Sequence, residues 1–166
     1  MYDIKERFLK SKLFWIIVSS MMLLLAAILL ILSFNRLKPH TSSDVVSSVI
    51  DWDYCQSSDI NRRYIEGLDL IIGTLNDDWE LMFYEYVGGE RKVAKKLIEA
   101  AAEDDAYIWG ETTEKNGFNY NITETYSTYD YMLSSRVANT LLYIGGPKED
   151  EDDIKELAIK LGYYKE

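Results

Sequence analysis

Few residues in this sequence have the types and spacing that catalysis requires. His40 is the single histidine and Cys55 the single cysteine. A zinc site draws three or four ligands from such residues, and a histidine-based dyad needs a paired nucleophile. The glycine pairs at 88–89 and 145–146 lack the Lys-Ser/Thr pair that completes a phosphate-binding loop. We therefore predict a protein that is not an enzyme and that holds no cofactor and no metal.

Carboxylates are abundant enough to supply acid–base pairs. Asp51 and Asp53 would share one face of a strand, but a domain of this size rarely builds the cleft that a glycosidase needs. The acidic run at 149–153 lacks the glycine of a calcium loop and is typical of a solvated first helical turn. Asp77 and Asp78 lie in a predicted turn, where they could contact a basic partner.

Tyrosines crowd the segment 120–131, where they alternate with asparagine and threonine. Tyrosine provides a large contact area at low entropic cost, and binding surfaces use it for that reason. The plainer alternative is that tyrosine suits a half-exposed sheet. We predict a binding face here, helped by the turn acids. The predicted partner-binding residues are Tyr120, Tyr126, Tyr129, Tyr131, Asp77 and Asp78.

The element that must position these residues at a membrane is the uncharged stretch 13–34. Its 22 residues would form a helix of roughly 33 Å, long enough to cross a hydrocarbon core of about 30 Å. A cleavable signal has a shorter apolar region and a small-residue cleavage site, whereas this stretch ends in bulky residues. We predict a retained transmembrane helix, with cleavage as the alternative.

The charge distribution predicts the orientation and the kind of partner. Four Lys or Arg residues precede the apolar stretch and two follow it closely, which places residues 1–12 in the cytoplasm. Residues 35–42 would be a tether, and residues 43–166 a domain outside the cell membrane. Residues 39–166 hold 12 Lys or Arg and 26 Asp or Glu, a net charge of −14. Such a domain is repelled by nucleic acid, so we expect no nucleic-acid partner.

The domain reads as an alternation of helices and strands. Predicted helices start at Ser43-Asp44, at Glu90 and at Glu149, the last of them ending at the glycine cap Gly162. Predicted strands cover 63–75, 79–87, 106–113 and 118–126, with the strand 79–87 apolar on both faces and Asn116-Gly117 as a hairpin turn.

The segment 127–144 fits either a helix or two strands that turn at Ser134-Ser135, and the strands are favoured by its tyrosine, valine and threonine residues. The fold class is therefore α+β: a single N-terminal transmembrane helix, followed by one small domain with an antiparallel sheet and about three helices packed on it. The lone thiol of Cys55 is either buried in this domain or available for intermolecular pairing.

Two functions fit these features. The first is a membrane-anchored, extracytoplasmic acidic protein that occupies a protein partner, either a basic protein or a secreted toxin. At the level of architecture only, the chain is similar to the immunity proteins with which bacteria neutralise secreted toxins, and that resemblance implies a small, acidic, catalytically empty binding domain. The alternative is a structural or accessory subunit of an envelope secretion or conjugation complex.

Overall fold

The computed structural model describes residues 12–34, 36–88, 96 and 110–165. The chain divides into two compact units, Met1–Arg36 and Leu37–Glu166. The predicted cytoplasmic tail up to residue 11, the predicted helix that starts at Glu90, and most of the predicted strand 106–113 lie outside the described residues.

The first unit contains one long apolar helix, α2 (Lys12–Phe34). Its segment Phe14–Ser33 is long and apolar enough to cross a membrane, and leucine, isoleucine and methionine side chains are exposed along it. Length and composition make this segment a candidate for a membrane anchor or a signal sequence. The predicted apolar helix is confirmed.

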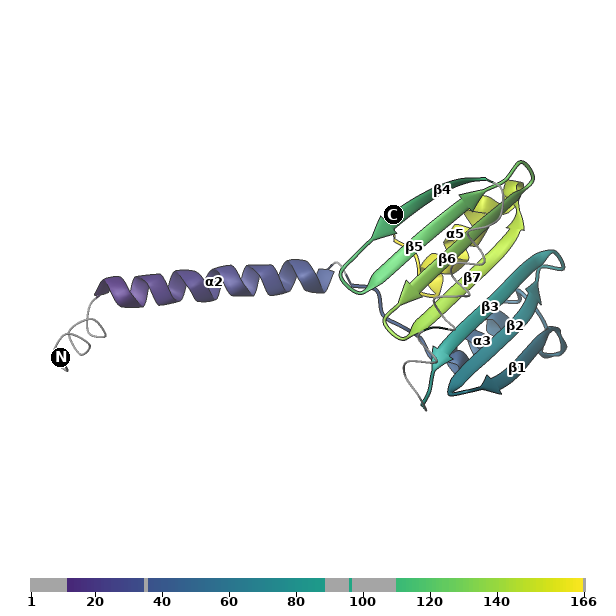
Figure 1. Cartoon of the computed structure of the whole chain (residues 1–166), viewed down its shortest axis with the longest axis horizontal. Helices are drawn as coiled ribbons and strands as arrows, with labels where there is room; N and C mark the ends of the chain where they lie inside the picture. Colours follow the sequence, from purple (N-terminus) through teal and green to yellow (C-terminus); the bar gives the residue numbers. More distant parts are fainter. Residues whose placement is uncertain (1–11, 35, 89–95, 97–109, 166) are drawn as a thin grey trace. The chain divides into compact units, whose positions relative to one another are not determined.

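The second unit is built on one antiparallel sheet of seven strands, in the order β1-β2-β3-β7-β6-β5-β4. Figure 1 shows the strands side by side. Both edge strands, β1 and β4, are almost entirely exposed, whereas β3 and β7 lie at the centre. The strands are β1 (Ile60–Ile65), β2 (Leu68–Leu75), β3 (Trp79–Tyr86), β4 (Glu111–Asn116), β5 (Tyr120–Tyr126), β6 (Asp130–Val137) and β7 (Thr140–Pro147).

The predicted strand 63–75 is in fact a hairpin. β1 and β2 pair from Ile65 opposite Leu68, and the chain reverses at Glu66 and Gly67, which have positive φ values of 48° and 86°. Two successive positive φ angles are the geometry of the tightest hairpin turns, which Asn-Gly and Asp-Gly pairs usually form. Glu-Gly is a weaker signal, and the sequence pattern alone misses it.

The ambiguous segment 127–144 forms strands, as we favoured, but its turn lies elsewhere. β6 and β7 pair from Val137 opposite Thr140, with Ala138 at a φ of 52° in the turn. The predicted turn residue Ser135 lies within β6, where its buried hydroxyl donates to the carbonyl of Tyr163. A buried acceptor satisfies this serine inside a strand, and sequence spacing cannot reveal such a partner.

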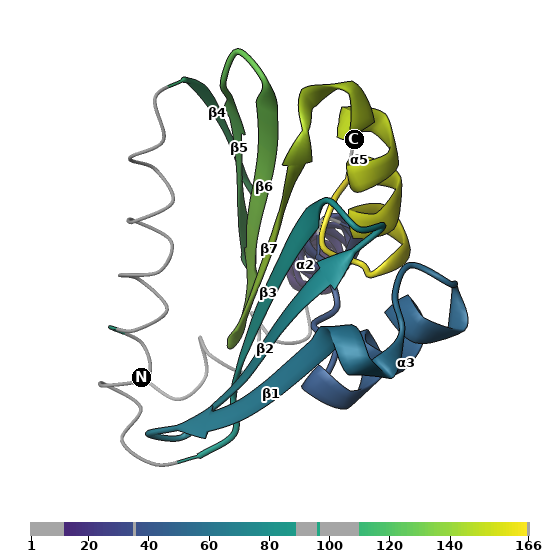
Figure 2. The ribbon, with the colours of Figure 1, turned by 90° about the vertical axis from the view of Figure 1, so that its right-hand side faces the viewer.

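Two helices, α3 (Ser42–Asp51) and α5 (Glu151–Lys160), cover the same face of the sheet, as Figure 2 shows. Thr41 caps α3 and forms a capping box with Asp44, so the N-cap lies two residues before Ser43, where the sequence placed it. The predicted cap at Gly162 is confirmed by its φ of 74° and by its N–H bond to the carbonyl of Ile159. Short 3-10 turns, η1 (Ser57–Asp59) and η3 (Lys148–Asp150), precede β1 and α5.

The main core lies between the sheet and these two helices. Apolar side chains from every second strand position face the helices and are fully buried there. The α+β class and the antiparallel sheet are thus confirmed. The largest fully buried side chains of this core include Phe83, Tyr131, Ile144, Ile154 and Tyr163.

The domain begins at Leu37, inside the predicted tether 35–42. Leu37 is buried, its N–H donates to the side-chain oxygen of Asn119 at 3.2 Å, and its carbonyl accepts from the Asn119 amide at 2.8 Å. The N–H of Ala138 donates to the carbonyl of Asn119 at 2.9 Å. We call the end of the strands that carries the turns 66–67, 117–119 and 138–139 the entry end. The opposite end of the strands, with residues 76–78, 127–129 and 147–150, is the far end.

Candidate functional site

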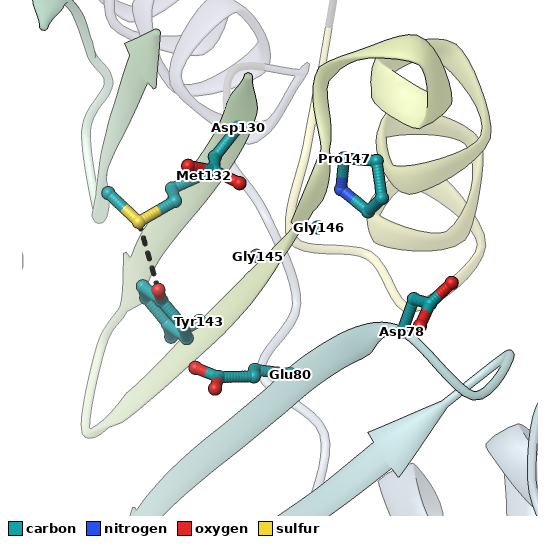
Figure 3. Close-up of a pocket in the computed structure, with 8 residues that line it drawn as sticks. All are labelled: Asp78, Glu80, Asp130, Met132, Tyr143, Gly145, Gly146 and Pro147. Carbon is teal, nitrogen blue, oxygen red and sulfur yellow. Dashed lines mark hydrogen bonds between the residues drawn. The ribbon is translucent and has the colours of Figure 1, made fainter. Parts of the chain in front are cut away.

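A groove with a volume of about 570 Å³ opens at the far end, on the sheet face that the two helices leave uncovered. Asp78 and Glu80 line one side, at the start of β3, and Asp130 lines the other side, at the start of β6. All three are exposed, and no basic residue is among the eight that line the groove. Figure 3 shows the three carboxylates around the ends of β3, β6 and β7.

Gly145 forms the floor of the groove because it has no side chain. It lies on β7 between Glu80 on β3 and Met132 on β6. A Cβ atom at this position would lie 2.9 Å from the hydroxyl oxygen of Tyr143, which is too close. The Tyr143 hydroxyl is directed to the Met132 sulfur, at 3.0 Å, so an aromatic ring and a thioether border the hollow (Figure 3).

The sheet register sets the width of the groove. Glu80 pairs with Gly145 and Asp130 pairs with Pro147, so the two acids flank β7 from opposite sides. Neighbouring strands lie about 4.8 Å apart, and the two positions are also offset by two residues along β7, so the backbone positions of the two acids lie roughly 12 Å apart. A guanidinium or ammonium group on a longer chain fits between carboxylates at this spacing.

Asp130 is held in place by a local turn. The Ser127 hydroxyl donates to the Asp130 carboxylate at 3.1 Å and accepts from the Asp130 N–H at 2.8 Å. Asp130 and Glu80 were not among the predicted site residues. The sequence signal that could have found them is their position at the starts of two strands, but it becomes useful only once β7 is known to lie between β3 and β6.

The two predicted turn acids line different hollows. Asp78 lines the groove, whereas Asp77 lines a neighbouring hollow of about 360 Å³ with Asp53, Asp59 and Cys55. Cys55 is half-buried, and burial together with the Asp59 carboxylate raises the pKa of its thiol, so it is protonated at neutral pH. Among the residues that the structure describes, no group of His, Cys, Asp or Glu side chains could hold a metal ion.

The predicted tyrosine face is not one exposed surface. Tyr120 and Tyr131 are buried in the core and Tyr126 is half-buried, all three on the helix-covered face, while Tyr129 is 80% exposed in the turn before β6. The alternation with asparagine and threonine was read correctly as a strand. The position of α5 decides which face of that strand is buried. The tyrosines, rather than the small polar residues, lie on the face that α5 covers.

Three tyrosines instead surround a buried carboxylate on β5. Glu124, only 7% exposed, accepts hydrogen bonds from the hydroxyl of Tyr131 at 2.8 Å and from those of Tyr126 and Tyr164 at 3.3 Å. The Lys155 ammonium from α5 lies 3.0 Å from the same carboxylate. We call these five side chains the Glu124 cluster. It ties α5 and the C-terminal segment to β5 and β6.

Within the Glu124 cluster, the charge of the carboxylate is balanced by Lys155 and by hydrogen bonds. Burial alone would raise the pKa of Glu124, but hydrogen bonds from Lys155 and Tyr131 outweigh burial and hold this pKa below its usual range. Burial and the neighbouring carboxylate raise the pKa of Tyr126 to about 12 and also raise that of Tyr131. The carboxylate is therefore ionised and the phenols of Tyr126 and Tyr131 are neutral, and both charged groups of the cluster have a partner of opposite charge, as in a structural network.

No protein-family model matches the sequence, and no curated protein matches it significantly. The structure is similar to the crystal structure of a GTP binding regulator from Thermotoga maritima, with a TM-score of 0.42 and 14% sequence identity. The match covers 78% of this chain and 93% of that chain.

Proposed function

We propose that this chain is a membrane-anchored, extracytoplasmic acidic protein that occupies a protein partner, and that the partner is a basic protein such as a secreted toxin. Helix α2 is the anchor in this proposal, with the N-terminus in the cytoplasm. The observation that carries it is the groove, which places Asp78, Glu80 and Asp130 around a floor that Gly145 leaves empty. A Lys or Arg side chain from the partner enters this groove.

The charge of the domain supports the same kind of partner. Residues 39–166 carry a net charge of −14, which would speed the encounter with a basic protein at low ionic strength. The groove carboxylates differ from the buried ones: they face solvent, and no lysine or arginine lines the groove beside them. A ligand cation would relieve their mutual repulsion.

The proposal is tested by capture with a charge-matched control. The full chain in detergent micelles is immobilised and exposed to secreted and envelope proteins of the organism that encodes it. A triple variant, D78N/E80Q/D130N, removes the groove charges, and E66Q/E114Q/D152N removes three exposed acids elsewhere. We expect the unmodified chain and the control to retain the same basic protein and the groove variant to lose it. Equal capture by both variants would contradict the proposal.

A subunit of an envelope complex is a second candidate, and the edge strand β1 favours it. Tyr64 is 68% exposed and Ile65 is 44% exposed, on an outer strand that could accept another strand. Copurification of the full chain with other membrane proteins, undiminished in the groove variant, would favour this second candidate over the first.

A further inference from the structure

The outer strand β1 leaves part of its backbone without a partner. It pairs with β2 over all six of its residues, without a bulge. Ile65 and Leu68 flank the two-residue turn and share hydrogen bonds, and such bonded positions alternate along an antiparallel pair. The N–H and C=O groups of Arg62 and Tyr64 therefore point away from the sheet. Within the part of the chain that the structure describes, no loop or side chain bonds to these outer groups.

Apolar side chains are exposed on both faces of this edge. Tyr64 shares the face that α3 covers and is 68% exposed. Ile65 lies on the opposite face and is 44% exposed, and Ile72 of β2 on that same face is 38% exposed. Many edge strands are protected by a bulge or a proline, and β1 has neither. A further strand would therefore gain both backbone hydrogen bonds and apolar contacts here.

The Tyr64 ring is already ordered in the free domain. The guanidinium carbon of Arg62 lies 5.3 Å from the centroid of this ring. Arg62 is itself fixed, because its Nε donates to Asp69 at 2.9 Å and its Nη1 donates to the Ser43 hydroxyl of α3 at 3.3 Å. A side chain that is already ordered loses little conformational entropy on binding. Tyr64 is therefore suited to anchor a partner.

The charges of β1 indicate the chemistry of this partner. Residues 60–65 contain two arginines and no acid, in a domain whose net charge is −14 over residues 39–166. Asp69 balances Arg62 in an ion pair. Arg63 lies on the opposite face and is exposed, and its guanidinium has no ion pair or hydrogen bond with any described residue. A carboxylate residue on an added strand, directly opposite Arg63, would place the two Cβ atoms about 5 Å apart, where opposite charges attract.

The acids nearest to Arg63 along the strand do not cancel this attraction. Asp59 and Glu66 lie four and three positions away, which is about 13 Å and about 10 Å of extended chain. The Debye length is about 8 Å at physiological ionic strength, so these acids act only weakly on a carboxylate opposite Arg63. A second copy of β1 would not balance Arg63, because it brings arginines rather than carboxylates to the edge.

We infer that β1 accepts an extended segment of a partner protein as an added strand, and that this segment carries a carboxylate opposite Arg63 between apolar residues. The backbone of the segment bonds to the outer groups of Arg62 and Tyr64. An apolar side chain two residues from the carboxylate packs on Ile65, and the residue between them covers the Tyr64 ring. The inference goes beyond the proposed groove function, because it needs neither the groove nor the anchor. It names the kind of segment that a neighbouring subunit would supply under the second candidate function.

The test measures the binding of short synthetic strands to the full chain in detergent micelles at physiological ionic strength. The fluorescein-labelled acidic peptide is Thr-Val-Thr-Asp-Thr-Val-Thr, and its basic counterpart has lysine in place of aspartate. A third peptide repeats the acidic sequence with N-methyl groups that block its backbone hydrogen bonds. We expect fluorescence anisotropy to show that the acidic peptide binds at least about tenfold more tightly than the other two. Hydrogen exchange at the amides of Arg62 and Tyr64 should slow several-fold when the acidic peptide is bound.

Four variants localise the binding to β1. Arg63→Glu should reverse the preference between the acidic and the basic peptide. Arg136→Glu is the matched control with the same charge change, because Arg136 is exposed on the same face and lies level with Arg63, four strands away. Tyr64→Pro removes an N–H that points out of the sheet, which an edge strand tolerates, and should abolish binding. Tyr64→Val keeps this N–H and should still bind the acidic peptide. Circular dichroism of each variant verifies that the fold is kept.

Three results would overturn the inference. The first is binding of the basic peptide as tight as that of the acidic one, or no binding of either. The second is binding of the acidic peptide that Arg63→Glu leaves unchanged. The third is a dimer of the free chain that Tyr64→Pro abolishes, because a second copy would then occupy the edge. The groove variant D78N/E80Q/D130N should bind the acidic peptide as the unmodified chain does, so a failure here leaves the proposed groove function standing.

Discussion

The acids of this domain fall into two groups that differ in how their charge is balanced. The buried carboxylates are each paired: Glu124 accepts from tyrosine hydroxyls and Lys155, and Asp69, only 1% exposed, accepts hydrogen bonds from Nε and Nη2 of Arg62. The groove carboxylates Asp78, Glu80 and Asp130 are exposed, with no basic residue in the lining.

This difference separates acids that hold the fold from acids that are available to a ligand. A buried charge is tolerated only when it is paired, and removing one partner then costs several kcal/mol. An exposed carboxylate contributes little to stability, so a group of them around a hollow is kept at no benefit to the fold. Substitutions of the buried carboxylates should therefore lower stability, whereas substitutions of the groove carboxylates should lower the affinity for a ligand.

The largest effect on stability is expected from Glu124→Ala. The change leaves the Lys155 ammonium with Glu151 alone and removes the acceptor of the Tyr131 hydroxyl. We expect the free energy of unfolding of residues 37–166 to fall by about 3 kcal/mol, within the range for a broken buried pair. Urea denaturation followed by far-ultraviolet circular dichroism measures it, and a loss below about 1 kcal/mol would mean that the pair contributes no more than an exposed one.

The contribution of the ionised Glu124 to stability should depend on pH. The pKa of Glu124 is lower in the folded domain than the value of about 4.3 for an unperturbed glutamate. The folded state therefore favours the ionised form, and the resulting stabilisation is present above the unfolded pKa and is lost as pH falls through the folded pKa. The gap in unfolding free energy between the unmodified domain and Glu124→Gln should shrink below about pH 4. A constant gap down to the acid transition would contradict it.

A smaller loss is expected from Tyr131→Phe. The phenylalanine ring keeps the packing in the core, but the hydrogen bond of 2.8 Å to Glu124 is lost. A hydrogen bond to a charged group contributes about 1.5 to 3 kcal/mol, and the remaining donors around Glu124 place this variant at the lower end. Tyr129→Phe, an exposed side chain, is the matched control and should leave the unfolding free energy unchanged.

The groove variant D78N/E80Q/D130N should have the smallest effect on stability. The three substituted side chains are exposed, and their removal makes the domain less negative. The unfolding free energy should therefore change by less than about 0.5 kcal/mol. The same urea titration measures it. A loss as large as that of Tyr131→Phe would assign these carboxylates to the fold and remove the contrast between the two groups.

Much of the fold was predictable because its signals are local. The hairpin between β4 and β5, the apolar positions of α5 and the Gly162 cap each follow from residues close in sequence. The predicted Asn116-Gly117 turn is displaced, however: Asn116 lies within β4, neither residue has a positive φ, and the chain reverses over residues 117–119. The hairpins at 66–67 and 138–139 were missed or misplaced because Glu66 and Ala138 rarely adopt positive φ, and only the pairing of the flanking strands forces them to do so.

The site was predictable only in part, since it depends on contacts between distant segments. Asp78 could be singled out from its turn, but its neighbours Glu80 and Asp130 meet it only through the insertion of β7 between β3 and β6. The tyrosines of β5 and β6 were assigned to a surface because a strand pattern gives two faces without saying which one α5 covers. Glu124, the residue that explains their placement, carries no signal of its own in the sequence.

The most direct test of the account is the affinity of the captured basic partner for three forms of the full chain: the unmodified protein, D78N/E80Q/D130N and E66Q/E114Q/D152N. Both variants have the same net charge, so they separate the groove from the overall field. We expect at least a tenfold loss of affinity for the groove variant, equivalent to about 1.4 kcal/mol, and a change within about twofold for the control. Binding should weaken as salt rises. Equal losses in both variants, or affinity that does not depend on salt, would contradict it.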